Sequence, residues 1–178
     1  MKQRRIISFL LVIFVTALIV FCSTAVAYMF KQTDYKNNEF VPASVSCEVF
    51  EQFDGEKKTS IQIQNTGNIN AYLRLRLVSY WVNADGNFMP KPSVMPEFNV
   101  ASGWIKGSND TYYYQMPVLP EAYCATLLSS PITLLSDEDG CKQVVEVFAE
   151  AIQSEPANAV TDSWKVTLDS NNYIVSAP

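Results

Sequence analysis

An alternation of apolar and polar residues between positions 71 and 81 predicts the central strand of the fold. It follows the turn signal Asn65-Thr66-Gly67-Asn68, since asparagine and glycine tolerate the positive backbone angles of tight turns. Successive side chains of a strand point to opposite faces of a sheet. One face collects Ala71, Leu73, Leu75, Leu77, Ser79 and Trp81, and the other collects Tyr72, Arg74, Arg76, Val78 and Tyr80. Two arginines on one face indicate an antiparallel strand with a buried face and a wetter face.

Short strands separated by turns are predicted over most of residues 43–178. Three prolines within residues 88–108 mark an irregular insert, because proline resists both helices and inner strands. Asp54-Gly55 is a hairpin signal. The remaining patterns place strands at residues 44–53, 59–64, 110–115, 126–135, 142–153 and 165–175, and a short helix at 157–164. This order predicts an all-β fold, an immunoglobulin-like antiparallel β-sandwich with one short helix.

A long apolar leader precedes the predicted sandwich. Lys2, Arg4 and Arg5 stand before an uncharged run at residues 6–30. Such a run is long enough to form a helix that crosses the roughly 30 Å hydrocarbon core of a bilayer. The basic residues favour a cytoplasmic amino terminus, which places the following domain outside the cytoplasm. The sequence therefore predicts an N-terminal hydrophobic signal or anchor helix and an exported domain.

Two interpretations of the leader stay open. Ala25 and Ala27 form the small-x-small pattern of a signal peptidase site, and cleavage there would leave Tyr28 as the first residue. On this interpretation residues 1–27 are a signal peptide, and the chain meets the membrane and signal peptidase only before processing. On the other, residues 6–30 stay as an anchor in the cytoplasmic membrane, with the domain outside.

The segment at residues 28–42 is polar and irregular, and it is predicted to be an extended arm or linker before a sandwich at 43–178. Its few apolar side chains have no evident partner within their own domain. We expect one of two roles. The arm adds as a strand to an open sheet edge of a neighbouring copy, so that cleavage after Ala27 switches on assembly, or it is only a tether.

Charge and composition exclude several classes of function. From Tyr28 onward the chain carries ten Lys+Arg against 18 Asp+Glu, a formal net charge of −8, without a basic cluster. Nucleic acid is therefore not expected as a partner. The chain has no histidine, which excludes Ser-His-Asp and Cys-His catalysis and the histidine-based zinc protease motif. No set of nucleophile, base and stabilising group can be assembled, so no enzyme activity, catalytic residue or cofactor is predicted.

The acidic run at residues 137–140 is the one candidate metal site. Adjacent carboxylates supply the oxygen ligands that calcium prefers. The run lacks the spacing of a calcium-binding loop, and we interpret it as a solvated turn. No metal site is predicted.

Cys47, Cys124 and Cys141 follow the leader, in a compartment where disulfides are possible. Cys47 is expected to share a strand face with apolar neighbours as a buried thiol. Cys124 and Cys141 would lie at opposite ends of a hairpin, far beyond the roughly 7 Å Cα separation that a disulfide allows. A bond between them is not expected, and the pairing is otherwise left open.

Aromatic residues offer one candidate interaction surface. Trp104, Tyr112, Tyr113 and Tyr114 could present rings to a sugar or a protein partner, because exposed aromatics are enriched in interfaces. Strand alternation would bury part of this run. On the central strand, Arg74 and Arg76 are expected to pair with Glu146 and Glu150 across a sheet.

Several motifs in order resemble the TasA/camelysin-like family of Gram-positive exported proteins. The junction Ala25-Val26-Ala27-Tyr28-Met29-Phe30 resembles a SipW-dependent-type signal peptide, and Asn38-Glu39-Phe40 with Val45-Ser46-Cys47-Glu48-Val49 resembles the family's first strand. The most recognisable match is Asn65-Thr66-Gly67-Asn68 with Ala71-Tyr72-Leu73-Arg74. Tyr112-Tyr113-Tyr114 and residues 147–153 fit related clostridial members. The resemblance implies a jelly-roll β-sandwich, export and, in the best-known members, fibres of a biofilm matrix. The proline-rich insert and the cysteines depart from the pattern.

Two functions follow as expectations. The first is an exported cell-surface or extracellular-matrix structural protein, including a self-assembling fibre subunit whose partner is another copy of the chain. The second is a membrane-anchored binding module for a cell-wall glycan or a protein, based on Trp104 and residues 112–114.

Overall fold

The computed structural model describes residues 3, 6–8, 11, 13–22, 41–137 and 139–178. The chain divides into two compact units, residues 1–41 and residues 42–178. In the first unit, residues 13–22 are helical. The membrane-spanning helix expected within residues 6–30 is not found, because no helix in the described part of the chain is long and apolar enough to cross a membrane. Ala25, Ala27, Tyr28 and the arm up to residue 40 lie outside the described residues.

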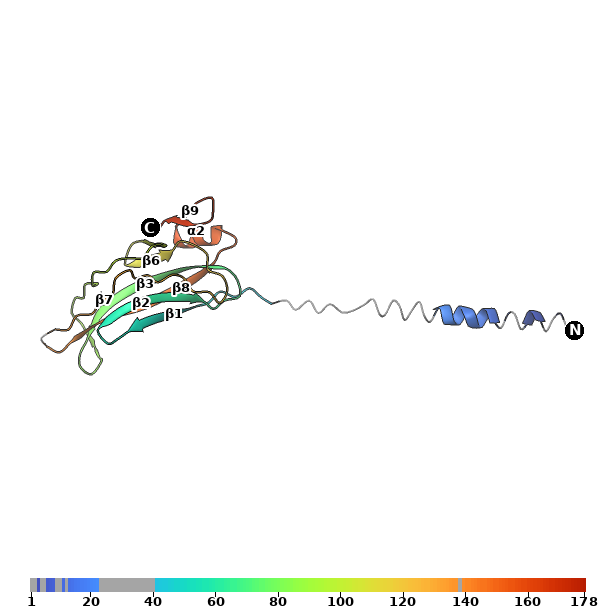
Figure 1. Ribbon diagram of the computed structural model, residues 1–178, viewed down its shortest axis with the longest axis horizontal. Coiled ribbons are helices and arrows are strands. Elements are labelled where there is room, and N and C mark those ends of the chain that lie inside the picture. The colour runs from blue at the N-terminus through green and yellow to red at the C-terminus, as the bar shows by residue number, and fades with distance from the viewer. Residues whose placement is uncertain (1–2, 4–5, 9–10, 12, 23–40, 138) are drawn as a thin grey trace. The chain divides into compact units, whose positions relative to one another are not determined.

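The second unit is a sandwich of two antiparallel sheets (Figure 1). The smaller sheet has the order β1-β2-β7, with strands β1 (Cys47–Phe53), β2 (Lys57–Asn65) and β7 (Ile132–Thr133). The Asp54–Gly55 turn joins β1 to β2, as the hairpin signal predicts. Asp54 Oδ1 accepts hydrogen bonds from the N–H groups of Glu56 and Lys57, at 2.9 and 2.7 Å. These two hydrogen bonds lower the pKa of the Asp54 carboxyl.

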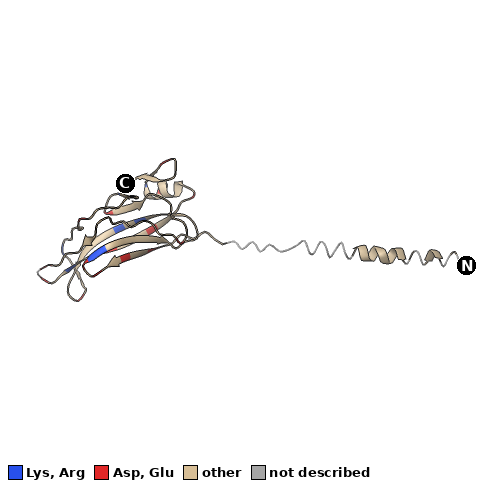
Figure 2. Ribbon diagram, viewed as in Figure 1, with Lys and Arg blue, Asp and Glu red and all other residues tan. Residues whose placement is uncertain are grey.

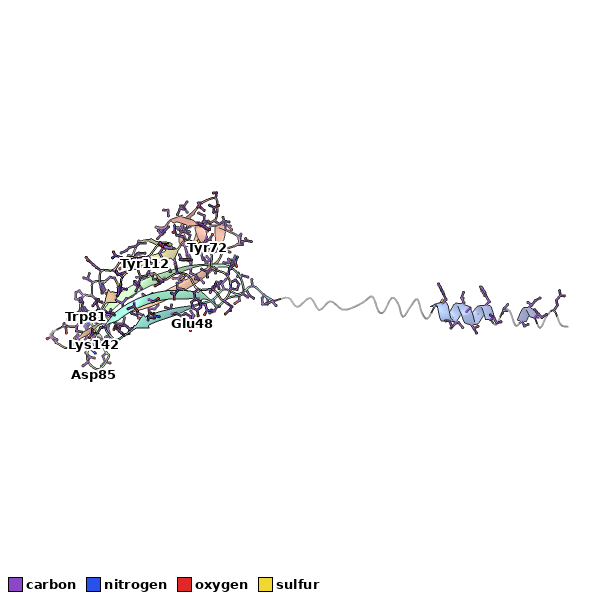
Figure 3. The ribbon with its side chains drawn as sticks, viewed as in Figure 1. Glu48, Tyr72, Trp81, Asp85, Tyr112 and Lys142 are labelled. Carbon is purple, nitrogen blue, oxygen red and sulfur yellow. The ribbon has the colours of Figure 1, made fainter. Side chains whose placement is uncertain are left out.

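The larger sheet is built on β3 (Ala71–Val82), which pairs along its whole length with β8 (Lys142–Gln153). On its other side β3 pairs with β4 (Phe88–Met89) and with β6 (Thr111–Tyr114), and β6 pairs with β5 (Trp104–Lys106). Figure 3 shows Tyr72 and Trp81 at opposite ends of β3. The two strands with the clearest alternation in the sequence therefore form the centre of the larger sheet.

The main core lies between the two sheets. The predicted inner face of β3 is buried at Ala71, Leu73, Leu75, Leu77 and Trp81. It packs with Ile61 and Ile63 of β2 and with Val145 of β8. Burying an aliphatic side chain of this size contributes about 1.5–3 kcal/mol. The alternation that predicts one buried face of β3 is confirmed.

A second, smaller core covers one end of the outer face of the larger sheet. Helix α2 (Asn158–Trp164) and the hairpin of β9 (Thr167–Leu168) and β10 (Ile174–Ser176) pack there. Val160, Trp164, Val166 and Ile174 surround Tyr72 and Tyr113. Tyr72 is therefore fully buried although it lies on the face that carries the arginines. The short helix expected at residues 157–164 is confirmed.

Three expectations differ from the structure. The strand expected at 126–135 is reduced to β7, because residues 121–128 follow the edge of β2 without regular pairing. The single strand expected at 165–175 is the β9–β10 hairpin, turned by Asp169, whose Oδ1 accepts the N–H groups of Asn171 and Tyr173 at 2.8 and 2.9 Å. The insert at 88–108 is not wholly irregular, since it contributes β4 and β5 to the larger sheet.

The turn after Asn65 forms for a different reason than expected. Gly67 does not have a positive φ angle; instead its missing side chain lets the Ser44 carbonyl oxygen approach closely, where a Cβ atom would collide with it. The N–H of Asn68 donates to the Ser44 carbonyl at 3.1 Å, and the N–H of Ser44 donates to Asn68 Oδ1 at 2.7 Å. The turn therefore fixes the chain just before β1.

Candidate functional site

One lateral side of the sandwich is closed by hydrogen bonds. Along β2, the N–H groups of Cys124 and Leu127 donate to the carbonyls of Ile63 and Ile61, at 2.9 and 2.8 Å. The N–H of Ala101, just before β5, then donates to the Leu127 carbonyl at 2.8 Å. These bonds link the smaller sheet to the larger one, so that this side offers little unpaired backbone.

The opposite side is open. It is formed by β1 and β8, which contact each other but are not paired by hydrogen bonds. Among the described residues, β1 pairs only with β2, and β8 pairs only with β3 apart from a single bridge between Lys142 and Ser136. Two sheet edges therefore lie side by side without a strand between them.

The free edge of β8 can be assigned residue by residue. The N–H of Gln143 donates away from β3, to the Leu135 carbonyl at 2.8 Å, whereas the N–H of Ser154 donates toward β3, to Asn70 at 3.0 Å. Because hydrogen-bonding directions alternate along an antiparallel strand, the backbone N–H and C=O groups of the odd-numbered residues point away from β3. These groups form the free edge, which comprises Val145, Val147, Ala149, Ala151 and Gln153.

A groove lies along this open side. It is lined by β1, β2, β3 and β8 through Val49, Glu51, Lys58, Tyr80 and residues 144–147. Next to it, a cleft of about 380 Å3 between the sheets shares Lys58, Val144 and Val145 with the groove. An extended peptide segment needs a channel of this kind beside a free edge.

A bulge turns one charged side chain toward this channel. The β1–β2 register shifts so that Gln52 faces Ser60 but Phe53 faces Lys58, which leaves Thr59 as the extra residue. Lys58 is only 6% exposed. Its ammonium pairs with Glu51 and lies 5.6 Å from the Phe53 ring centroid. Figure 2 shows the charges of both sheets: acidic residues on β1 and β8, and basic ones on β2 and β3.

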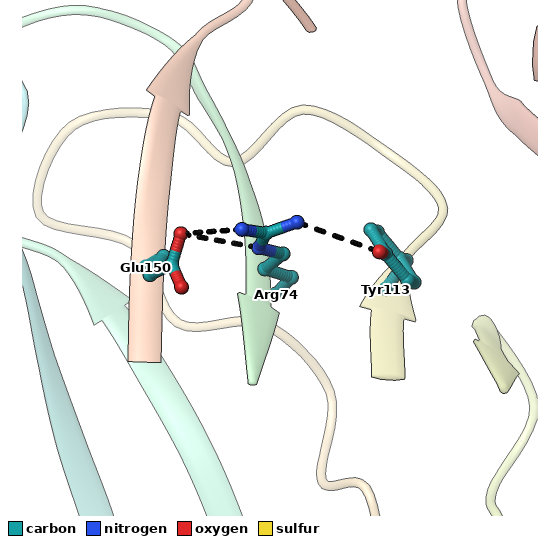
Figure 4. Close-up of polar contacts among 3 residues, drawn as sticks. All are labelled: Arg74, Tyr113 and Glu150. Atoms are coloured by element: carbon teal, nitrogen blue, oxygen red, sulfur yellow. Dashed lines mark hydrogen bonds and ion pairs between the residues drawn. The ribbon is translucent and has the colours of Figure 1, made fainter. Parts of the chain in front are cut away.

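The outer face of the larger sheet carries the predicted arginine pairing in part. Arg74 donates two hydrogen bonds to Glu150 Oε2, from Nε at 3.2 Å and from Nη2 at 2.7 Å (Figure 4). Its Nη1 donates a third hydrogen bond to the Tyr113 hydroxyl at 3.4 Å. Its guanidinium carbon lies 4.6 Å from the Trp164 ring centroid. Arg74 thus connects the sheet to α2. Arg76 lies opposite Phe148 in the register rather than opposite a glutamate, and no carboxylate in the described part of the chain pairs with it.

The expected aromatic interaction surface is contradicted by burial. Trp104 is 7% exposed, and Tyr112, Tyr113 and Tyr114 are 1%, 3% and 8% exposed. Tyr112 and Tyr114 pack in the main core with Trp104, while Tyr113 packs in the second core under α2. Both faces of β6 are covered, so alternation does not leave either set of rings in solvent. These residues stabilise the fold, and their rings do not form an exposed aromatic patch.

The acidic turn contacts the insert. Asp137 pairs with Lys91, and its Oδ1 accepts the N–H of Cys141 at 2.7 Å. The hydrogen bond from Lys91 lowers the pKa of the Asp137 carboxyl. The ammonium of Lys91 also lies 4.4 Å from the ring centroid of Trp81. Within the described residues, which omit Glu138, no group of histidine, cysteine and carboxylate side chains could hold a metal ion.

Cys47, Cys124 and Cys141 of the sandwich are free thiols in the described part of the chain. Cys124 is buried, and its Sγ accepts the N–H of Ile63 at 3.1 Å. Cys47 is only half-buried, and burial and then the charge of Glu150 raise the pKa of its thiol.

We expect Cys124 to resist thiol reagents in the folded protein. Burial raises the pKa of its thiol to about 11, and only the thiolate is nucleophilic. At pH 8 its thiolate fraction is then on the order of 100-fold below that of an ordinary cysteine with a pKa near 8.5. The measurement is labelling by Ellman's reagent of residues 42–178 carrying Cys47→Ser and Cys141→Ser. Rapid labelling before denaturant is added would contradict the expectation.

Comparison of the chain with protein-family models, with curated proteins and with solved structures finds no match. The resemblance to the TasA/camelysin-like family therefore rests on the sequence motifs alone and stays a prediction.

Proposed function

We propose that this chain is an exported structural protein of the cell surface or extracellular matrix, whose sandwich joins other copies through the open side formed by β1 and β8. The free edge of β8 is the observation that carries the proposal. Residues 143–153 contain no proline and no lysine, two of the residues with which soluble proteins protect exposed edges. The apolar leader and the motif resemblance support export. The resemblance also supports a jelly-roll order of the strands, which is part of the proposal.

Strand addition on this edge supplies the binding free energy. Each hydrogen bond from a partner backbone to the free edge contributes about 0.5–1.5 kcal/mol. The side chains of Val147, Ala149 and Ala151 are half-buried against the main core. A partner strand added along the free edge of β8 would bury these side chains further. Affinity thus comes from the backbone, and specificity comes from side chains that enter the groove.

The occupant that we propose is the arm of a neighbouring copy. Residues 28–42 precede β1 and carry Tyr28, Met29, Phe30, Tyr35 and Phe40 as apolar side chains. An arm that follows an uncleaved leader is held near the membrane. Cleavage after Ala27 would release it, so processing acts as the step from monomer to polymer. The competing hypothesis is that the arm is a tether.

Deletion of the arm separates these hypotheses. We expect residues 28–178 to form oligomers or fibres, and residues 39–178 to stay monomeric with an unchanged circular dichroism spectrum. The measurements are light scattering over a range of concentration and pH, and electron microscopy. The matched control keeps residues 28–38 in scrambled order and should assemble less well than the native arm. Equal assembly by residues 39–178 would leave the arm as a tether, and a strict monomer for residues 28–178 would count against a self-assembling subunit.

A membrane-anchored binding module is the second candidate. It no longer has the aromatic run as support, because these rings are buried. It is favoured instead by a separate cleft beside the insert, lined by both polar and apolar side chains.

A further inference from the structure

A cleft of about 530 Å3 lies between the second half of the insert and the β5–β6 turn. One wall is residues 95–100, held against residues 128–130. The N–H of Asn99 donates to Ser130 Oγ at 2.8 Å, the N–H of Ser129 donates to the Asn99 carbonyl at 2.9 Å, and Val100 forms a bridge with Leu128. This wall is therefore fixed by backbone hydrogen bonds although it contains no regular strand.

The opposite wall is the β5–β6 turn. Asn109 and Asp110 both adopt left-handed backbone angles, with φ of 53° and 52°. Among residues with a side chain, asparagine and aspartate adopt this region most readily. The conformation lets the Asp110 carbonyl accept the N–H of Leu77 at 3.0 Å. Its carboxylate pairs at 3.2 Å with Lys106, and both side chains line the cleft.

Aromatic and apolar side chains form the rest of the lining. Tyr112 comes from β6 and Phe98 from the insert, with ring centroids 5.7 Å apart. The Lys106 ammonium lies 5.6 Å from the Tyr112 ring centroid. Phe98 is half-buried and Tyr112 almost fully buried. The cleft thus combines apolar surface with two carboxylates, one ammonium and the polar groups of Asn99 and Ser130.

We infer that this cleft binds a neutral saccharide chain. Sugar hydroxyls both donate and accept hydrogen bonds, which suits the mixed carboxylate, ammonium and amide lining, and the C–H faces of sugar rings suit Phe98 and its apolar neighbours. The volume lies in the range of small-molecule sites. Asp110 already neutralises Lys106, and no cation pairs with Glu97 among the described residues. The remaining negative charge disfavours phosphate, sulfate and uronate groups.

This site is independent of the proposed assembly. Its residues belong to the insert, β5, β6 and the loop before β7, whereas the open side is formed by β1 and β8. Loss of one function therefore leaves the other measurable. Residues 42–178 contain both cores and are a compact unit by themselves, so this domain without the arm serves for binding measurements.

The test is an NMR titration of the 15N-labelled domain with four tetrasaccharides. The neutral probes are cellotetraose and chitotetraose; a fully deacetylated chitosan tetramer is the cationic probe, and a galacturonic acid tetramer is the anionic one. We expect at least one neutral probe at millimolar concentration to shift the amide signals of residues 95, 97–100, 106–112 and 130. Binding by neither neutral probe, or binding only by a charged probe, overturns the proposal.

Two variants locate the site. Glu97→Ala and Lys106→Ala each remove one polar group, and each should weaken binding about fivefold or more. The matched controls are Glu48→Ala and Lys142→Ala, which change exposed charges on β1 and β8. The spectra themselves report whether each variant is folded. Unchanged affinity in both cleft variants would place the saccharide elsewhere and overturn the assignment.

Discussion

Replacement of Asn65 by aspartate is expected to remove a large part of the stability of the sandwich. Asn65 is fully buried at the end of β2. Its Nδ2 donates to the carbonyls of Ile69 and Val118, at 2.8 and 2.9 Å, and its Oδ1 accepts the N–H of Gly67 at 3.0 Å. The side chain therefore both donates and accepts hydrogen bonds. These bonds connect the end of β2 to the turn that follows it and to Val118, which precedes the segment at 121–128.

An aspartate has the same shape but no donor when it is ionised. Its carboxylate would face two carbonyl oxygens inside the protein, where an unpaired charge is strongly unfavourable. We expect a loss of about 3–5 kcal/mol, a large part of the 5–15 kcal/mol that a domain typically has. The measurement is the free energy of unfolding in urea, followed by circular dichroism.

The pH dependence of this variant has a definite sign. Burial raises the pKa of a carboxyl group above its unfolded value, so its protonated form is favoured in the folded state. The destabilisation should be largest above the folded pKa and should decrease as the pH falls through it. Asn87→Asp, at an exposed turn position, is the control and should change stability by less than about 0.5 kcal/mol. An equal effect at both positions would contradict the proposed role of Asn65.

The regular part of this fold could be predicted because it follows alternation. β3 and β8 have long period-two patterns, and the structure pairs them over the whole of residues 142–153. The segment at 121–128 could not be predicted in this way. Its contacts with β2 use irregular backbone bonds and the Thr126 hydroxyl, which accepts the N–H of Ile61 at 3.3 Å. Such pairing leaves no periodic signal in the sequence.

The burial of the aromatic run could be predicted only in part, for a physical reason. Alternation assigns Tyr113 to one face of β6 and its neighbours to the other, but it does not say whether each face is covered. The outer face is covered here because Val160 and Trp164 give α2 an apolar side. The spacing of four residues between Val160 and Trp164 is the feature of the sequence that indicates an apolar helix face able to cover the sheet. The cleft beside the insert was not visible in the sequence, since residues 95–100, 106–112 and 130 meet only in the folded chain.

Proline at position 149 is expected to abolish assembly while leaving the sandwich folded. Ala149 lies opposite Leu75 in the register, and its N–H belongs to the free edge of β8. Proline removes this donor and places its ring where a partner strand would pair. No hydrogen bond to β3 is lost, because the bonds to β3 are made by the backbone groups of the neighbouring residues Phe148 and Glu150 and not by those of Ala149. An edge strand tolerates proline where the missing N–H points outward.

Two controls make this result specific. Ala149→Ser keeps the N–H at a similar side-chain size and should assemble as the unmodified chain does. Phe148→Pro removes a hydrogen bond to β3 and should instead lower the free energy of unfolding, which separates damage to the sheet from damage to the edge. The measurements are light scattering for assembly and urea unfolding for stability, on residues 28–178. If Ala149→Pro and deletion of residues 28–38 act on one interface, then combining them has no additional effect on assembly. Normal assembly of the Ala149→Pro variant would show that the free edge of β8 is not the site at which copies meet.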